Sequence, residues 1–304
     1  MTPLPSSTPA FLSIMEEVSR QIYPAATLYV VATPIGNAGD ISLRALHVLS
    51  IADAIACEDT RNTGHLLGRY GLSKELIAAH EHNERAAADV LIARLQAGQR
   101  IALVSDAGTP AVSDPGARIV DAVLGAGLRV MPLPGASAAV AALSAGGLVN
   151  DRFQFVGFLP AKAKQRDTAL AELRGVAATL VFYEAPHRIL DTVAALAARF
   201  EPKRQVVFAR ELSKLFEEIH RCPLAEAPAW IAADANRQKG EFVILLEGAP
   251  AVAPDDEEAE RILAILLEEC PVKQAASLAA RITGQKKNAL YELALRIRQQ
   301  DTAE

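Results

Sequence analysis

The sequence predicts an α/β protein with two α/β domains and a small helical segment near its C-terminal end. Three observations support this prediction. From residue 28 onward, short β-rich apolar runs alternate with stretches of helical periodicity. The rhythm changes near Asn150, and a Pro- and acid-rich stretch at 249–260 then precedes three purely helical patterns. These changes place domains at 27–149 and 150–249, and a helical segment at 257–300.

The first 26 residues are rich in Pro, Ser and Thr, and we expect a flexible leader there. They lack the basic start and apolar core of a signal peptide. No apolar run reaches the roughly 18 residues of a membrane helix. The cysteines Cys57, Cys222 and Cys270 are far apart and form no paired motif, which predicts a reduced, cytoplasmic protein.

The first domain contains five expected strands, at 28–34, 54–58, 76–80, 100–105 and 128–133. Helical patterns lie between them. One follows a start signal at Asp40 or Ser42, and another follows Asn83. Strand–helix alternation of this kind is typical of a parallel sheet with helices on both faces.

The second domain contains five strand-like segments, at 152–160, 178–185, 204–212, 217–224 and 240–248. Two consecutive strand pairs lack a long helix between them. Because a parallel connection needs a long crossover, we expect a mixed sheet.

The helical segment has patterns at 261–270, 272–282 and 286–297, and the last two resemble a helix-turn-helix joined by TGQK. Two interpretations remain open: a helical appendage that packs on its neighbours, or a nucleic-acid reader.

The bulk composition limits the class of function. The chain has 304 residues, is 51% hydrophobic and carries a net charge of −5. These values are typical of a packed, soluble protein and argue against one that coats nucleic acid through its overall charge. A local basic patch remains compatible with them.

Polar loops follow all five strands of the first domain, at 33–40, 58–64, 80–84, 105–116 and 132–139. Ligands of open α/β sheets bind beyond the carboxyl ends of the strands, so these loops predict a binding site at one edge. None of them contains a P-loop or the G-x-G-x-x-G motif. His80 and His82 do not match zinc-ligand spacing, so we expect no metal.

The loop ALVSDAGTPAVSDPG, at 102–116, has no Lys to hold a phosphate. Gly108 allows close approach of the backbone, and Pro110 fixes its path, so backbone groups there could recognise a flat base and an amino-acid tail without reading charge. Ser137 starts a helix of small residues and offers a hydroxyl and helix N–H groups to a carboxylate. The same alanine-rich helix also suits close helix–sheet packing.

Nine stretches in order cover about residues 27–248 and carry a resemblance: LYVVATPIGNAGDISLRAL, EDTRNTGHLL, HEHNE, ALVSDAGTPAVSDPG, PLPGASAAVAALSAGGL, FVGFLPAK, FYEAPHRI, ARELSKLFEE and GEFVILLEG. They resemble the tetrapyrrole methylase-like superfamily of S-adenosylmethionine-dependent methyltransferases. The match is closest to members that methylate the ribose 2′-hydroxyl of a cytidine in 16S rRNA of the small ribosomal subunit. Such members commonly carry a C-terminal helix-turn-helix segment.

The resemblance implies two α/β domains of the tetrapyrrole methylase type with the active cleft between them, a homodimer, and S-adenosylmethionine bound in the cleft. It implies these cofactor contacts in the first domain: Asp106, Gly108, Thr109, Pro110, Val112, Ser137 and Ala138. In the second domain it implies Tyr183, Glu184, Leu212, Gly240 and Glu241. For Asp106, shaping the turn or serving the acceptor hydroxyl are alternatives.

A ribose hydroxyl is a weak nucleophile, so a base that takes its proton helps transfer. Our candidates are Glu58 and Asp59 of the EDTR stretch, with Arg61 orienting the carboxylate or holding an RNA phosphate. A structural ion pair between Glu58 and Arg61 is the alternative. His80, Glu84 and Asp106 are further candidate bases.

The best basic cluster for RNA is AKAKQR, with Lys162, Lys164 and Arg166, and with Arg188 and Lys214 behind it. A solvated charged face is the alternative reading. Unpaired rRNA is the expected target, because proteins read sequence mainly in single-stranded RNA. Two other functions stay open: a small-molecule, tetrapyrrole-like methylase, and a non-catalytic RNA-binding module.

Overall fold

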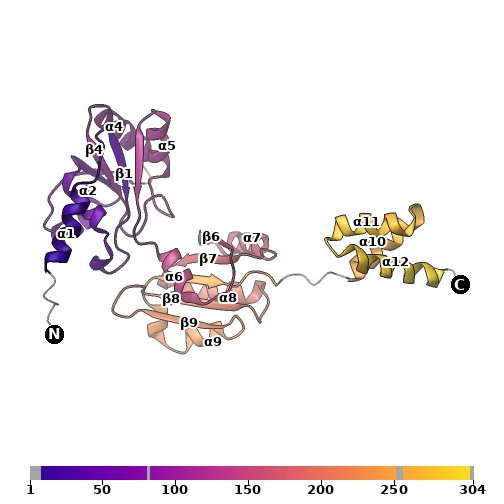
Figure 1. Cartoon of the computed structure of the whole chain (residues 1–304). Helices are drawn as coiled ribbons and strands as arrows, with labels where there is room; N and C mark the ends of the chain where they lie inside the picture. Colours follow the sequence, from indigo (N-terminus) through magenta and orange to yellow (C-terminus); the bar gives the residue numbers. More distant parts are fainter. Residues whose placement is uncertain (1–7, 81–82, 251–255, 302–304) are drawn as a thin grey trace. The chain divides into compact units, whose positions relative to one another are not determined.

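The computed structural model describes residues 8–80, 83–250 and 256–301. The chain forms two compact units, Met1–Gly248 and Ala249–Glu304, which are described separately. The first unit contains both α/β domains (Figure 1).

The first domain is a five-stranded sheet in the order β3-β2-β4-β1-β5, and all of its paired strands are parallel, as predicted. Its strands are β1 (Thr27–Val31), β2 (Ala54–Cys57), β3 (Glu75–Ala78), β4 (Arg100–Val104) and β5 (Arg129–Leu133). The carboxyl ends of all five therefore lie at one edge, where the sequence places the polar loops.

Helices cover both faces of this sheet because successive strand residues point to opposite sides. Tyr29 and Val31 pack on the face that carries α2, whereas Leu28 packs on the face that carries α4 and α5. The helices are α2 (Leu43–Ile51), α3 (Thr60–Arg69), α4 (Glu84–Gln96) and α5 (Ala117–Gly125), with the 3-10 turn η1 (Ala38–Asp40). Helix α2 begins after Ser42, whose hydroxyl accepts a hydrogen bond from the Ala45 N–H.

The expected flexible leader contains a helix, α1 (Thr8–Ser19). Val18 and Tyr23 are buried, and the Tyr23 ring lies 4.7 Å from the ring of His47 on α2. The expectation of a leader without regular structure is therefore wrong from residue 8 onward. Burial of the Val18 and Tyr23 side chains stabilises this segment despite its Pro- and Ser-rich composition.

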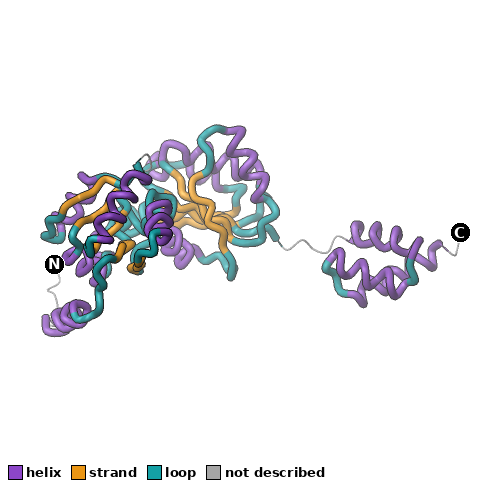
Figure 2. Tube along the Cα trace, turned by 90° about the horizontal axis from the view of Figure 1, so that it is seen from above, coloured by secondary structure: helices purple, strands orange, loops and turns teal. Residues whose placement is uncertain are grey.

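The second domain is a mixed five-stranded sheet in the order β6-β7-β10-β8-β9, as the short connections predicted. Only β6 and β7 pair in parallel. Its strands are β6 (Phe153–Phe158), β7 (Thr179–Glu184), β8 (Gln205–Arg210), β9 (Glu218–Pro223) and β10 (Phe242–Leu246). Its other elements are α7 (Ala163–Leu173), η2 (Pro186–Arg188), α8 (Ile189–Arg199), α9 (Ala227–Ala232) and η3 (Ala235–Gln238). Figure 2 shows the strands of both sheets in orange among purple helices.

Helix α6 (Ala138–Gly146) belongs by sequence to the first domain but packs on the second sheet. Ala139 and Ala142 form one core with Val207 and Leu245. Figure 1 shows α6 lying beside the strands of the second sheet. A Cβ at Gly146 would lie 2.5 Å from Leu245, so the helix approaches the sheet closely. The packing boundary between the domains therefore lies between β5 and α6 rather than at 149/150, and Ser137 stands at this crossing.

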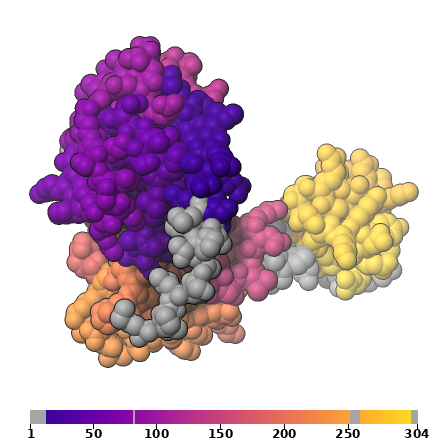
Figure 3. All heavy atoms as spheres, turned by 60° about the vertical axis from the view of Figure 1, so that its left-hand side comes forward, coloured from indigo at the N-terminus to yellow at the C-terminus, as the bar shows by residue number. Residues whose placement is uncertain are grey.

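The C-terminal unit contains the three predicted helices, α10 (Asp256–Glu269), α11 (Val272–Thr283) and α12 (Lys287–Asp301), shown in yellow in Figure 3. Small buried side chains, among them Ala275, Ala279 and Ala294, let them pack closely. The turn between α11 and α12 begins at Gly284, which has φ +72°. Residues 251–255 of the expected linker lie outside the described residues, and Asp256 onward is helical. In the described ranges, none of the helices has both the length and the apolar character needed to cross a bilayer.

Candidate functional site

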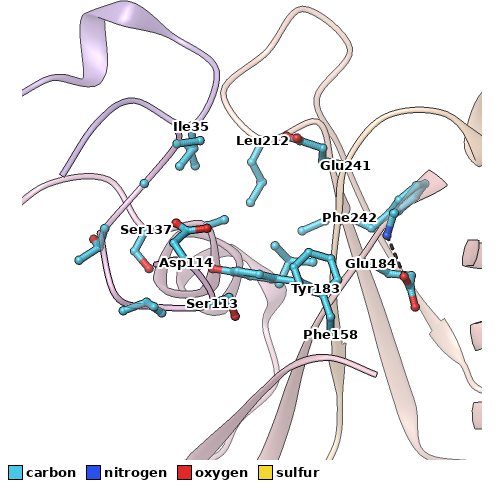
Figure 4. A pocket seen from close by; sticks show the side chains of 18 of the residues that line it. Ile35, Ser113, Asp114, Ser137, Phe158, Tyr183, Glu184, Leu212, Glu241 and Phe242 are labelled. Carbon is cyan, nitrogen blue, oxygen red and sulfur yellow. Dashed lines mark hydrogen bonds between the residues drawn. The ribbon is translucent and has the colours of Figure 1, made fainter. Parts of the chain in front are cut away.

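A cavity of about 310 Å³ lies between the two α/β domains (Figure 4). Its volume is at the lower end of the range for small-molecule sites, about 300–1,000 Å³. The first domain contributes Ile35, Ala107, Gly108, Thr109, Val112, Ser113, Asp114, Ser137 and Ala138. The second domain contributes Phe158, Tyr183, Glu184, Ala185, Pro186, Ala209, Leu212, Lys214, Glu241, Phe242 and Val243.

Among the described residues, three of the five polar loops contribute to the cavity wall, namely those after β1, β4 and β5. The strand order explains this selection. Strands β4, β1 and β5 are neighbours, whereas β2 and β3 occupy the other side of the sheet. The described residues of the loops at 58–64 and 80–84 therefore lie outside the cavity wall.

The cavity contains nine of the twelve side chains expected at the cofactor, namely Gly108, Thr109, Val112, Ser137, Ala138, Tyr183, Glu184, Leu212 and Glu241. Among the described residues, Asp106, Pro110 and Gly240 lie outside its wall. Sequence reasoning missed Asp114 and Phe158, although both stand inside stretches that it singled out.

Gly108 shapes the cavity without offering it free backbone groups. Its φ is +80°, which favours glycine. Its N–H donates to the Thr33 carbonyl at 3.0 Å, and its carbonyl accepts from the Thr33 N–H at 2.8 Å. The expected backbone cradle is thus a bridge that ties the β4 loop to the end of β1.

Strained backbone is found in two loops that contribute residues to the cavity wall. Ala111 and Ser113 in the first domain, and Glu211 and Ser213 in the second, have φ between +52° and +67°. Non-glycine residues adopt this region at a cost, and such residues cluster at functional sites. The strain marks the two loops, at 111–116 and 211–214, as the shaped parts of the site.

Tyr183 binds one of the α6 N–H groups that were expected to bind a ligand carboxylate. Its hydroxyl accepts a hydrogen bond from the Ala139 N–H, at the start of α6, at 3.1 Å. Burial raises the pKa of the Tyr183 phenol, so it stays protonated. The side chain of Ser137, which precedes α6, makes no capping hydrogen bond and lines the cavity.

Asp114 faces the cavity beside Ser137 and Tyr183 (Figure 4). Burial raises the pKa of its carboxyl group, and the nearby charge of Asp106 acts in the same direction. A carboxylate with a raised pKa is a better proton acceptor than an ordinary aspartate.

Glu184 also lines the cavity, but its carboxylate turns away from it (Figure 4). The side chain has no exposed surface. It accepts hydrogen bonds from the Thr192 hydroxyl at 2.6 Å and the Ala185 N–H at 2.9 Å. Arg188 lies 3.3 Å from it. The backbone of Glu184, not its charge, is what a ligand meets.

Lys214 closes the cavity from the second domain through an ionic network. Its Nζ donates to Glu211 at 2.9 Å and to Glu241 at 2.8 Å. The carboxylate of Glu211 also accepts from the Glu241 N–H at 2.9 Å. A Cβ at Gly240 would collide with the Glu211 side chain, so Gly240 supports this network from behind.

The EDTR stretch forms the start of α3. Asp59 is the N-cap: its Oδ1 accepts from the N–H groups of Arg61 at 2.7 Å and Asn62 at 3.4 Å. The Arg61 guanidinium lies 2.8 Å from Oδ2. Hydrogen bonds from the Arg61 side chain and backbone lower the pKa of Asp59 to about 2. Asp59 is thus a weak proton acceptor that caps a helix.

Asp106 belongs to the same construction. Its carboxylate accepts from the Asn62 side chain at 2.7 Å and from the Asp59 N–H at 3.2 Å. It joins the loop after β4 to α3, which favours the turn-shaping role among those the sequence left open. Glu58 lies beside this junction and outside the cavity wall.

In the loop after β3, Glu84 has a structural role. Glu84 is buried and accepts from the Gly116 N–H at 2.6 Å, which fixes the end of the 105–116 loop. His82 lies outside the described residues. Among those that are described, no group of three His, Cys, Asp or Glu side chains could hold a metal ion.

The predicted basic residues divide into two groups. Lys162 and Lys164 are exposed at the start of α7. Arg166 is buried, Arg188 is paired with Glu184, and Lys214 belongs to the cavity network. Helical spacing turns Arg166 inward, two residues after exposed Lys164, so the expected cluster is smaller than the sequence suggested.

Comparisons with known proteins agree with this architecture. Residues 27–228 match the family model for tetrapyrrole (corrin/porphyrin) methylases, and residues 253–298 match that of the RsmI C-terminal HTH domain. Among solved structures, uroporphyrin-III-C-methyltransferase from Thermus thermophilus covers 73% of this chain and 94% of its own length. Its TM-score is 0.54 at 21% identity. The methyltransferase CobJ has a TM-score of 0.56 at 20% identity, over 75% and 97% of the two chains.

Sequence relatives are much closer. Ribosomal RNA small subunit methyltransferase I from Escherichia coli O157:H7 is 53% identical over 269 residues, which are 88% of this chain and 94% of the relative. The protein of the same name from Pseudomonas aeruginosa is 51% identical over 89% and 97%. The chain therefore belongs to the tetrapyrrole methylase family and, within it, to the ribosomal RNA small subunit methyltransferase I family.

Proposed function

We propose that this protein transfers a methyl group from S-adenosylmethionine to the ribose 2′-hydroxyl of a cytidine in 16S rRNA of the small ribosomal subunit. The observation that carries the proposal is the cavity itself. It lies where the family's two domains meet, and most of the side chains expected at the cofactor line it. Relatives named as small-subunit rRNA methyltransferases match over nearly their whole length.

The cavity residues fit this cofactor. Val112, Ala209 and Leu212 offer apolar surface for an adenosine. Ser137 and the start of α6 offer polar groups to a carboxylate. Asp114 offers a negative charge to a sulfonium or an ammonium group. When bound, S-adenosylmethionine supplies an electrophilic methyl group on a sulfonium.

The protein's own residues then align the acceptor and take its proton. Alignment of oxygen, methyl carbon and sulfur is worth several kcal/mol, because it removes the entropy cost of bringing two reactants together. We assign proton acceptance to Asp114, whose carboxylate faces the cavity and has a raised pKa. Asp114 would accept the hydroxyl proton as the oxygen–methyl bond replaces the methyl carbon–sulfur bond, with the sulfur leaving as a neutral thioether.

The three EDTR residues predicted to be catalytic now have different proposed roles. Glu58 stays a second candidate base, whereas the low pKa of Asp59 argues against it as a proton acceptor. The side chain of Arg61 is mostly exposed, which suits contact with an RNA phosphate.

Lys162 and Lys164 are the proposed phosphate contacts of the second domain, because both are exposed. A homodimer and a cytoplasmic location, both expected from the resemblance or the sequence, belong to the same proposal.

The test uses purified protein, S-adenosylmethionine carrying a labelled methyl group, and small ribosomal subunits that lack the modification. We expect label on one ribose 2′-oxygen, located by nuclease digestion and mass spectrometry. Label only on a base would contradict the proposal. Transfer to a tetrapyrrole with none to rRNA would favour the small-molecule alternative, and calorimetry without cofactor binding would favour the non-catalytic one.

A further inference from the structure

We propose that Phe158 is a stacking platform for a nucleobase of the acceptor RNA, at the mouth of the cavity. This inference rests on the proposed function. Phe158 lines the cavity and is 51% exposed, so its ring is open to a ligand that approaches from solvent. Nothing in the cofactor arrangement described above uses its ring.

The position of Phe158 is built by a β-bulge. Residues three apart in a regular strand point to opposite faces of the sheet. Phe155 and Phe158 nevertheless both contact Tyr183, with ring centroids 5.0 and 5.8 Å away. The register between β6 and β7 shifts between Phe155 and Gly157, and Gly157 has φ +72°. The bulge re-aims Phe158 toward the cavity, a known use of bulges beside active sites.

The first domain lies against this bulge. A Cβ at Gly157 would lie 2.9 Å from the hydroxyl oxygen of Ser113, so the Ser113 side chain packs closely against the Gly157 backbone. Ser113 is one of the strained cavity residues and precedes Asp114. Phe158 thus lies beside the loop that carries the proposed proton acceptor.

The Phe158 ring is not stacked on Tyr183. Their contact is T-shaped, with an interplanar angle of 71°, and about half of the Phe158 surface is exposed. An aromatic face that is open to solvent binds any base by stacking, without a hydrogen-bond code. An enclosed site would suit an adenine of the cofactor better than this half-open one.

Lysines follow within a few residues. Lys162 and Lys164 are exposed, and four residues from Phe158 to Lys162 span at most about 14 Å. The acidic Asp167 of α7 is paired with Arg199 at 2.8 Å, so its charge is neutralised locally. An aromatic platform beside free cations is the usual arrangement for single-stranded nucleic acid.

The test compares F158A, F158W and the matched control F153A. Phe153 lies on the same strand, is 55% exposed and does not line the cavity. For F158A, we expect KM for the small subunit to rise roughly 5- to 150-fold, the range for loss of one base–aromatic stack. F158W and F153A should stay close to wild type. The cofactor Kd, measured by calorimetry, should not change in any variant.

A second readout is direct. Single-stranded RNA with a fluorescent cytidine analogue should be quenched on binding to wild type and F158W, but not to F158A. Unchanged KM and quenching in F158A would overturn the inference, and so would a loss of cofactor affinity equal to the rise in KM. A wild-type protein that binds RNA with quenching but transfers no methyl group would instead overturn the proposed function alone.

Discussion

Each of the two α/β domains contributes an acidic residue to the wall of the same cavity, and the two carboxylates are used differently. Asp114 of the first domain faces the cavity, and burial raises the pKa of its carboxyl group. Glu184 of the second domain has no exposed side-chain surface and is bound by Thr192 and Arg188. One group is left available for chemistry, whereas the other holds β7 to α8.

The difference shows that an acidic residue can line a cavity without its carboxylate being available to a ligand. A buried charge that is fully paired stabilises the fold only as long as its partners remain. A partly buried charge that keeps its access to a ligand costs stability but gains reactivity. Substitutions at the two positions should therefore separate activity from stability.

The largest effect is expected for D114N. Removal of a general base costs about 10²- to 10⁴-fold in rate, so kcat for rRNA methylation should fall by that factor. Tm should not fall, because a carboxyl group with a raised pKa destabilises the folded state when it is charged. Single-turnover rates at saturating cofactor and calorimetric cofactor binding would measure both.

The pH profile provides the control for this prediction. The wild-type rate should rise with pH through the raised pKa of Asp114, since only the deprotonated form accepts the proton. D114N should lose that limb. If D114N weakens cofactor binding but leaves kcat unchanged, Asp114 is a cofactor contact and not the proton acceptor.

The next effect is expected for R188A, on stability. It leaves the buried Glu184 carboxylate without its cation, which costs about 3–5 kcal/mol in the free energy of unfolding. Urea unfolding would measure this cost. The double variant E184Q/R188A should recover part of it, because the remaining side chain is neutral. An R188A protein with normal stability but weak rRNA binding would instead support the RNA contact expected from the sequence.

Much of the fold was predictable because it depends on local patterns. Strand–helix alternation gave the parallel sheet of the first domain and its ligand-binding edge. The order of the strands was not predictable, because it depends on which strands pair across long connections. That order decides that the loops after β4 and β5 reach the cavity while Glu58 and Asp59 do not.

The errors have similar causes. Helix α6 follows the first domain in sequence but covers the second sheet, because its small residues fit closely against Leu245. The basic pattern AKAKQR does not reveal that Arg166 is buried. Phe158 carries no motif signal of its own, because a bulge rather than the residue type directs it to the cavity.

A smaller effect extends the comparison to the lysines. Each phosphate contact to single-stranded nucleic acid contributes about 0.7 to the slope of log affinity against log salt. The double variant K162A/K164A should therefore flatten the slope for rRNA binding by about 1.4, because both lysines are exposed. K214A should leave the slope unchanged, since Lys214 is paired with Glu211 and Glu241. Equal slopes for K162A/K164A and wild type would contradict the phosphate contacts.

The smallest effect is expected at Asp59, one of the two EDTR carboxylates predicted as a base. Its pKa is about 2 in the folded protein, below the value of about 3.9 in an unfolded chain. Asp59 therefore stabilises the fold above about pH 4, and this contribution disappears as the pH falls toward 2. D59A should lower Tm by a few degrees at pH 7 through loss of the helix cap, and its Tm should approach that of wild type near pH 2. R61A, which removes the ion pair but keeps the cap, should change Tm less, because exposed ion pairs contribute little. If D59A also lost as much kcat as D114N, proton acceptance would have to be reassigned from the cavity to the start of α3.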